Sequence, residues 1–96
     1  MSGVAIVGAG TMGRAIAAGF ARSGKRTLLV SRDPAGADPA PAGVDLVGAL
    51  PDEPPAMVVE AIPEDLALKT AFFRSVEARY GPDSAPLMAS NTSGLP

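Results

Sequence analysis

The sequence has 96 residues, no cysteine, no histidine and a formal net charge of −2, with a pI of about 4.9. This composition excludes a disulfide framework and the usual zinc sites, and it offers no basic surface for nucleic acid. Apolar residues make up 47% and aromatic residues 4%, so we expect one domain with an aliphatic core. No apolar run reaches membrane-spanning length and the start has no signal-peptide pattern, so we expect a cytoplasmic protein.

The pattern from residue 4 to residue 30 predicts a strand, a helix and a second strand. Val4–Val7 is a short run of mainly β-branched residues, typical of a strand buried on both faces of a parallel sheet. After a glycine-rich turn, apolar residues repeat every four positions from Met12 to Phe20, as on one face of a helix. Gly24 follows at the position of a helix C-terminal glycine. Thr27–Val30 is the second strand.

The connection that follows, Arg32–Pro55, holds six prolines and three glycines. Its first part, Pro34–Gly43, cannot sustain a helix because proline removes a donor and blocks the preceding turn. Val44–Val47 is a candidate short strand within this connection. Ala56–Ile62 is the third strong apolar run and predicts a buried strand.

The last third of the sequence predicts a helix and a final strand. Glu64–Tyr80 begins with two acidic residues, which favour a helix N-terminus, and is followed by Gly81-Pro82, which ends a helix. Leu87–Ser90 is the final strand. The apolar residues of the helix repeat at intervals of four and of seven: Leu68, Phe72 and Val76; Leu66, Phe73 and Tyr80.

Hydrophobic strands that alternate with helices predict the α/β class, here a Rossmann-type parallel sheet with flanking helices. The glycine-rich turn between the first strand and the first helix leads us to interpret residues 1–96 as one incomplete NAD(P)-binding domain.

The glycine-rich turn, Gly8-Ala9-Gly10-Thr11-Met12-Gly13, has the spacing and context of a dinucleotide-binding turn. It follows a strand, opens a helix, and precedes a second strand that ends about 20 residues later. Gly8 permits the tight turn, Gly10 lets the backbone approach a pyrophosphate, and Gly13 lets helix and strand pack closely. We therefore predict that all six residues contact a cofactor. A turn that serves packing alone, with Met12 in the core, is the alternative.

The end of the second strand indicates which nicotinamide cofactor is bound. NAD-specific units place an acidic residue there to hold the ribose 2′-hydroxyl, whereas this sequence has Ser31-Arg32 and only then Asp33. A hydroxyl followed by a guanidinium suits a 2′-phosphate, so we slightly favour NADP over NAD and predict contacts from Ser31 and Arg32. The alternative is a solvated turn in which Arg32 pairs with Asp33.

Three segments resemble the 3-hydroxyacyl-CoA dehydrogenase family, and together they cover nearly the whole chain outside residues 34–55. They are Gly8-Ala9-Gly10-Thr11-Met12-Gly13-Arg14-Ala15-Ile16-Ala17, Val58-Val59-Glu60-Ala61-Ile62-Pro63-Glu64-Asp65-Leu66-Ala67-Leu68-Lys69 and Ala89-Ser90-Asn91-Thr92-Ser93-Gly94-Leu95. The resemblance implies hydride exchange between a nicotinamide and a 3-hydroxyacyl or 3-oxoacyl thioester.

The resemblance also implies roles for four residues. Glu64 and Lys69 match family residues near the nicotinamide and its ribose, Asn91 matches a cofactor-side residue, and Ser93 matches the catalytic serine that hydrogen-bonds the substrate oxygen. Each has a structural alternative: Lys69 could form a surface ion pair with Asp65, and Glu64 could merely favour the helix N-terminus. Glu60, in the preceding strand, could be a buried structural acid.

The sequence departs from the family in three ways. The catalytic histidine of the family lies well downstream of the Asn-Thr-Ser segment, and no histidine is present here, so the general base is missing. Ser31 replaces the acid at the strand end. The connection Arg32–Pro55 is too short for the family's helical hairpin, which helps to hold coenzyme A.

These departures predict the N-terminal part of a longer dehydrogenase, whose thioester substrate is carried by coenzyme A or by acyl carrier protein. A homodimer is expected only with the family's C-terminal domain. Residues Ala15–Gly24 with the Ser-Arg strand end also resemble pyrroline-5-carboxylate reductases, which use NADPH. A non-catalytic nucleotide-binding module is the third hypothesis for the function. Asn91-Thr92-Ser93 and the Glu64–Lys69 spacing favour the dehydrogenase.

Overall fold

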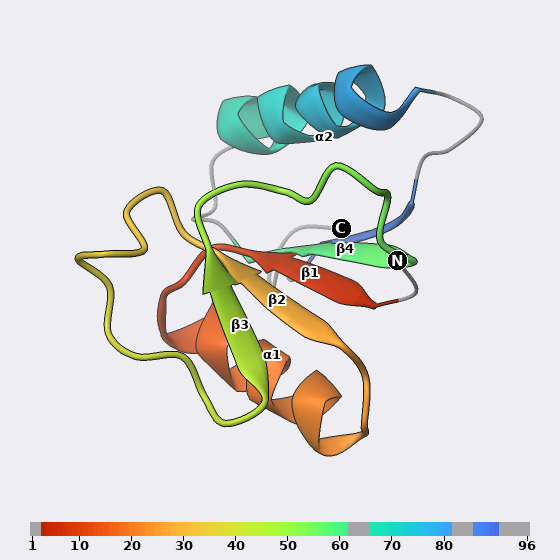
Figure 1. The fold of residues 1–96 in the computed structure, drawn as a ribbon. Coiled ribbons are helices and arrows are strands. Elements are labelled where there is room, and N and C mark those ends of the chain that lie inside the picture. The colour runs from red at the N-terminus through yellow and green to blue at the C-terminus, as the bar shows by residue number, and fades with distance from the viewer. Residues whose placement is uncertain (1–2, 62–65, 82–85, 91–96) are drawn as a thin grey trace.

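The computed structural model describes residues 3–61, 66–81 and 86–90, and within them one parallel sheet lies between two helices (Figure 1). The strand order is β3-β2-β1-β4-β5. Helix α1 spans Thr11–Arg22 and helix α2 spans Leu66–Tyr80. The strands are β1 (Val4–Val7), β2 (Thr27–Val30), β3 (Val44–Val47), β4 (Met57–Glu60) and β5 (Leu87–Ser90).

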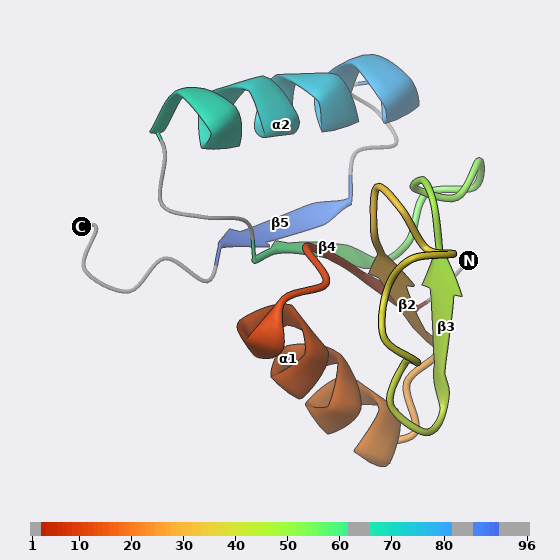
Figure 2. The ribbon, with the colours of Figure 1, turned by 90° about the vertical axis from the view of Figure 1, so that its left-hand side faces the viewer.

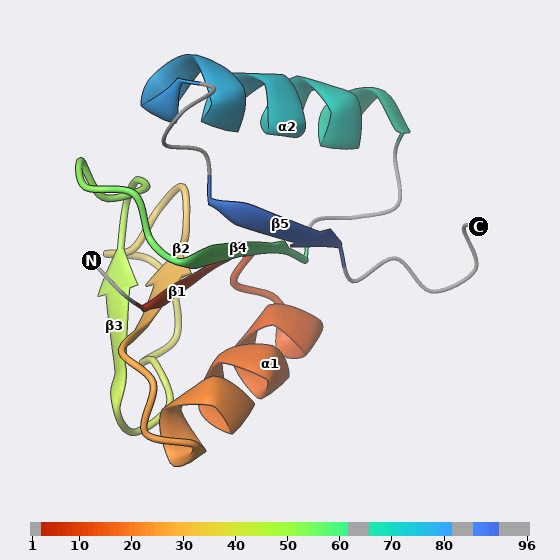
Figure 3. The same ribbon diagram turned by 90° about the vertical axis from the view of Figure 1, so that its right-hand side faces the viewer.

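The order of the strands reverses between β1 and β4. From β1 the chain adds β2 and then β3 on one side, and it then crosses back to add β4 and β5 on the other. Helices α1 and α2 cover opposite faces of the sheet, as the two side views show (Figures 2 and 3). In open parallel sheets, ligands bind outside the carboxyl ends of the strands at such a reversal.

Each face of the sheet has its own aliphatic core because side chains alternate along each strand. On the α1 face, Ile6 and Leu29 are fully buried together with Ala17 of the helix. On the α2 face, Ala5 and Val58 are buried, and Phe72 of α2 packs against them. The predicted aliphatic core is thus confirmed, although no described methionine is buried within it.

The strands are in register, so their carboxyl ends form one edge. Val47, Val30, Val7, Glu60 and Ser90 are successive partners across this edge. The ladder continues one residue further, since the Gly8 N–H donates to the Val30 carbonyl at 3.1 Å and the Ser31 N–H to the Val47 carbonyl at 2.9 Å. Residues that directly follow the strands are therefore held beside one another.

The Rossmann-type class and all five strands are confirmed, but the predicted apolar face of the second helix is partly wrong. Leu66 and Leu68 are 74% and 53% exposed, whereas Lys69, Val76 and Tyr80 are buried. The face of α2 that carries Lys69 packs toward the sheet, because the Glu60 carboxylate of β4 compensates the buried lysine charge. Its C-terminal end is fixed by the Tyr80 hydroxyl, which donates to the Pro51 carbonyl at 2.6 Å. Neither described helix has a segment long and apolar enough to cross a membrane.

Candidate functional site

The glycine-rich turn joins β1 to α1 in a conformation that requires glycine at two positions. Gly8 has a φ of 115°, a region that side chains rarely adopt. A Cβ atom on Gly13 would collide with the Gly8 carbonyl oxygen, so the helix could not lie this close to the turn. The predicted roles of both residues in the turn are thus confirmed.

Gly10 differs, because neither its backbone nor its surroundings demand glycine. Its φ is −78°, and a Cβ atom there would meet no atom of the described chain within 4 Å. It is the N-cap of α1, has no side chain to cap the helix, and no acidic residue lies in the first turn. The first N–H groups of a helix have no partner within the helix, and the space beside Gly10 is open, so this N-terminus suits a phosphate.

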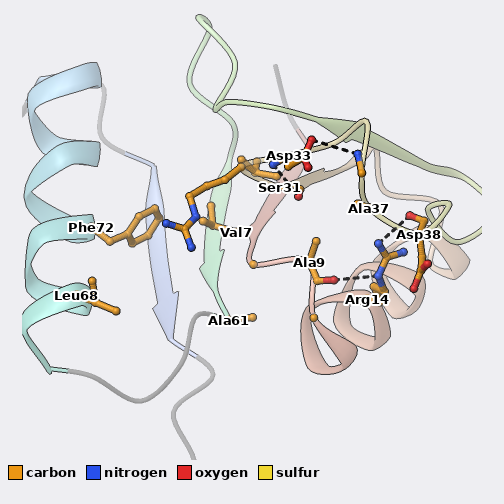
Figure 4. Close-up of a pocket in the computed structure, with 15 residues that line it drawn as sticks. Val7, Ala9, Arg14, Ser31, Asp33, Ala37, Asp38, Ala61, Leu68 and Phe72 are labelled. Atoms are coloured by element: carbon orange, nitrogen blue, oxygen red, sulfur yellow. Dashed lines mark hydrogen bonds between the residues drawn. The ribbon is translucent and has the colours of Figure 1, made fainter.

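A cavity of about 970 Å³ lies at the carboxyl edge of the sheet, beside this turn (Figure 4). Its floor is the end of β1 with Gly8, Ala9 and Gly10. One wall comes from residues 30–33, from the loop 36–38 and from Arg14. The opposite wall comes from α2, where Leu68 and Phe72 point toward the cavity, with Ala61 between the two walls (Figure 4).

The end of β2 presents Ser31 and Arg32 to the cavity, as predicted from the sequence. The Ser31 Oγ accepts a hydrogen bond from the Asp33 N–H at 3.3 Å, and the Asp33 Oδ1 accepts one from the Gly36 N–H at 3.1 Å. No ion pair joins Arg32 to Asp33 in the described part of the chain. The aspartate carboxylate thus stabilises the turn after β2 rather than neutralising Arg32.

Arg14 is a cavity residue that the sequence analysis did not select. Its Nε donates to the Ala9 carbonyl at 2.9 Å, Nη1 to the Pro39 carbonyl at 2.7 Å and Nη2 to the Asp38 carbonyl at 2.8 Å. The guanidinium therefore connects the glycine-rich turn to the proline-rich loop. The available signal was a basic residue directly after the third glycine, but the partners are up to 25 residues away in sequence.

A hydrogen-bonded network that contains a buried ion pair lies at the carboxyl ends of β4 and β5. Lys69 Nζ of α2 donates to Glu60 Oε1 at 2.8 Å and to Oε2 at 2.7 Å, and Ser90 Oγ donates to Oε1 at 2.6 Å. Glu60 is 0% and Lys69 4% exposed. Glu60 is thus a buried, hydrogen-bonded acid, as its structural alternative predicted, and Lys69 is not a surface side chain.

The structure brings five of the predicted cofactor residues to the cavity, and the others lie elsewhere or outside the described residues. Gly8, Ala9, Gly10, Ser31 and Arg32 line it. Thr11 and Met12 are exposed on the first turn of α1, so Met12 is not in the core. Lys69 is in the buried pair, and Glu64, Asn91 and Ser93 lie outside the described residues. Contacts from the predicted cofactor residues to a cofactor, and the catalytic role of Ser93, stay predictions.

Comparison with known proteins identifies the family. The sequence model of the 3-hydroxyacyl-CoA dehydrogenase NAD-binding domain matches residues 3–49 and 52–96, which is nearly the whole chain. The chain belongs to this family. The match includes the glycine-rich turn, the Val-Val-Glu strand and the Asn-Thr-Ser segment, and it favours the dehydrogenase over the pyrroline-5-carboxylate reductase resemblance. Among curated proteins, a sequence search finds no significant match.

Solved structures of similar fold come from longer proteins. The dehydrogenase part of multifunctional enzyme 1 from C. elegans superposes with a TM-score of 0.80 at 24% identity over 99% of this chain. FadB2 from M. tuberculosis gives 0.77 at 26% identity over 100%, and a diketoreductase acting on dicarbonyl compounds gives 0.77 at 20% over 99%. This chain spans 27%, 42% and 43% of their respective lengths.

The residues at the cavity fit the NAD of this domain family. The open space at Gly10 would receive the pyrophosphate against the N-terminus of α1, and Ser31 and Arg32 would face the adenosine ribose. The cofactor would supply the hydride chemistry, while the chain would bind and orient it. In the described part of the chain, no three carboxylates lie close enough together to hold a metal ion.

Proposed function

We propose that this NAD-binding domain serves an oxidoreductase that interconverts 3-hydroxyacyl and 3-oxoacyl thioesters by hydride exchange with a nicotinamide. The observation that carries the proposal is the cavity between the glycine-rich turn and the end of β2, in a chain whose family is shown. Ser93, beyond the end of β5, is the proposed group that hydrogen-bonds the substrate oxygen, and Asn91, Glu64 and Lys69 are the proposed cofactor-side residues.

The general base in this proposal comes from outside the 96 residues, because these contain no histidine. The domain itself binds the dinucleotide and presents one face of the nicotinamide to the substrate. Titration of the chain with NADH and NADPH, followed by the cofactor's fluorescence, tests the binding half of the proposal. Saturable binding supports it, and no binding of either cofactor would contradict it.

We further propose that NADP is preferred over NAD. The support is local: Ser31 and Arg32 line the cavity, and the first acid, Asp33, is hydrogen-bonded to the Gly36 N–H. A 2′-phosphate would thus meet a hydroxyl and a guanidinium instead of the carboxylate typical of NAD-specific units.

A last proposal concerns the carrier of the thioester. The connection between β2 and β4 contains β3 and turns but no helix, so the hairpin that helps to hold coenzyme A in the family has no counterpart here. A carrier protein could replace the lost contacts. The enzyme that contains this domain should therefore show a higher kcat/KM for an acyl-carrier-protein substrate than for the matching coenzyme A thioester, and the reverse order would contradict the proposal.

A further inference from the structure

Glu60 is the meeting point of three elements that are distant in sequence. Its carboxylate, at the carboxyl end of β4, accepts hydrogen bonds from Lys69 of α2 and from Ser90 at the end of β5. Glu60 and Ser90 are direct partners in the sheet register, so their side chains lie on the same face, the one that α2 covers. The carboxylate therefore fixes α2 and β5 relative to β4.

This network lies on one side of the strand-order reversal, and the adenosine side lies on the other. Gly10 and the end of β2 account for the pyrophosphate and the adenosine ribose on the β1–β2 side. Because a dinucleotide crosses the reversal, its nicotinamide half would extend over the ends of β4 and β5. Those two ends are occupied by Glu60 and Ser90.

The elements that Glu60 joins carry one wall of the cavity and some of the proposed cofactor-side residues. Leu68, next to Lys69 on α2, lines the cavity, as does Phe72 one turn further along the helix. Along the chain, Asn91 directly follows Ser90. Glu60 itself is fully buried and is not among the described residues that line the cavity. Its influence on a bound cofactor must therefore pass through the groups that it holds.

We propose that Glu60 is a positioning residue for the nicotinamide half of the site, acting through Lys69 and Ser90. The inference rests on the proposed function. It differs from a purely structural role in one measurable respect: loss of the network should weaken binding of the whole dinucleotide and spare the adenosine half. A purely structural role would lower stability and leave the two affinities in their original ratio.

The test compares NADH with ADP, a probe of the adenosine and pyrophosphate side alone, in the wild-type chain and in Glu60→Gln. We expect the Kd for NADH to rise about tenfold or more and the Kd for ADP to change less than about twofold, as when a supporting partner of a binding group is removed. Asp52→Asn is the matched control, because it makes the same change in an exposed ion pair with Arg79 and should alter neither Kd.

A second pair of variants decides the question if Glu60→Gln does not fold, since it leaves the lysine charge buried. Ser90→Ala removes one hydrogen bond without stranding a charge, and Ser90→Thr keeps the hydroxyl. We expect weaker NADH binding in Ser90→Ala, near-wild-type binding in Ser90→Thr, and unchanged ADP binding in both. Equal effects on NADH and ADP, or no effect on either, would overturn the positioning role. Failure of the wild-type chain to bind both NADH and NADPH would instead contradict the proposed function, and the inference with it.

Discussion

At the end of β2, a hydroxyl and a guanidinium stand where NAD-specific units have a carboxylate. A 2′-phosphate carries about −1.5 to −2 charges at neutral pH, and a hydrogen bond to a charged partner contributes about 1.5–3 kcal/mol. We therefore expect the chain to bind NADPH about tenfold or more tightly than NADH. Arg32→Ala should remove most of this preference and leave the Kd for NADH unchanged.

Titration of the wild type and the variants with NADH and NADPH measures these affinities, and Ser31→Asp is the complementary variant. Its carboxylate would repel the 2′-phosphate and could accept hydrogen bonds from the 2′-hydroxyl, so the order of the two affinities should reverse. Tighter binding of NADH by the wild-type chain, unaffected by Arg32→Ala, would show that Ser31 and Arg32 do not recognise the phosphate.

Two glycines of α1 should respond oppositely to alanine. Gly13→Ala places a Cβ against the Gly8 carbonyl, so the helix and the turn must separate, and we expect a loss of about 1–3 kcal/mol or more in the free energy of unfolding. A Cβ on Gly19 would contact only the Arg22 side chain, at 3.9 Å. Gly19→Ala should therefore stabilise the chain by about 0.5–1 kcal/mol. Urea denaturation measures both, and equal effects would contradict the close contact at Gly13.

Among the elements, the proline-rich loop after β2 is held to the rest of the molecule by Arg14. Its guanidinium donates to carbonyls of the turn and of the loop at 2.7–2.9 Å. In Arg14→Ala we expect the free energy needed to open the loop to fall by about 1–2 kcal/mol. Limited proteolysis within residues 35–42 should therefore become faster. Binding of NADH and NADPH should weaken by the same factor, because the loop forms a wall of the cavity.

Arg22→Ala serves as the control, because Arg22 is an exposed arginine on the same helix. This variant should leave proteolysis and binding unchanged. A selective loss of NADPH binding in Arg14→Ala would contradict the account of Arg14 as a loop anchor and would mean that the guanidinium contacts the 2′-phosphate.

The central strands β1, β2 and β4 could be predicted from the sequence because strands buried on both faces of a parallel sheet are short, mainly apolar runs. The orientation of α2 could not, because it depends on a lysine that the apolar pattern counts as outward-facing. Lys69 can be buried because the carboxylate of Glu60, nine residues earlier in sequence, lies beside it in the fold.

In the site, too, features set by the local sequence could be predicted, and contacts between distant residues could not. The glycine-rich turn was predictable because its constraints are local: a positive φ at Gly8 and a helix that begins at once. The anchoring of the loop by Arg14 and the link from Ser90 to Glu60 join residues 24 to 30 positions apart. No local pattern encodes such contacts, so they became visible only in the folded chain.

For the molecule as a whole, binding and catalysis should separate. The chain has no histidine to accept the hydroxyl proton, so the 96 residues should bind the cofactor and yet fail to reduce a 3-oxoacyl thioester. The assay follows NADPH and NADH oxidation with the thioester present at saturating cofactor. Robust turnover by this chain alone would contradict the proposal that the base comes from elsewhere.

The central claim is that a dinucleotide lies across the carboxyl edge of the sheet with its pyrophosphate at Gly10. Gly10→Ala tests it most directly, because the added methyl group meets no atom of the described chain yet occupies the space assigned to the pyrophosphate. We expect the free energy of unfolding to fall by no more than about 1 kcal/mol, the cost of alanine at an N-cap. The Kd values for NADH and NADPH should both rise about tenfold or more. A folded Gly10→Ala chain that binds both cofactors as tightly as the wild type would show that the pyrophosphate does not lie at this turn.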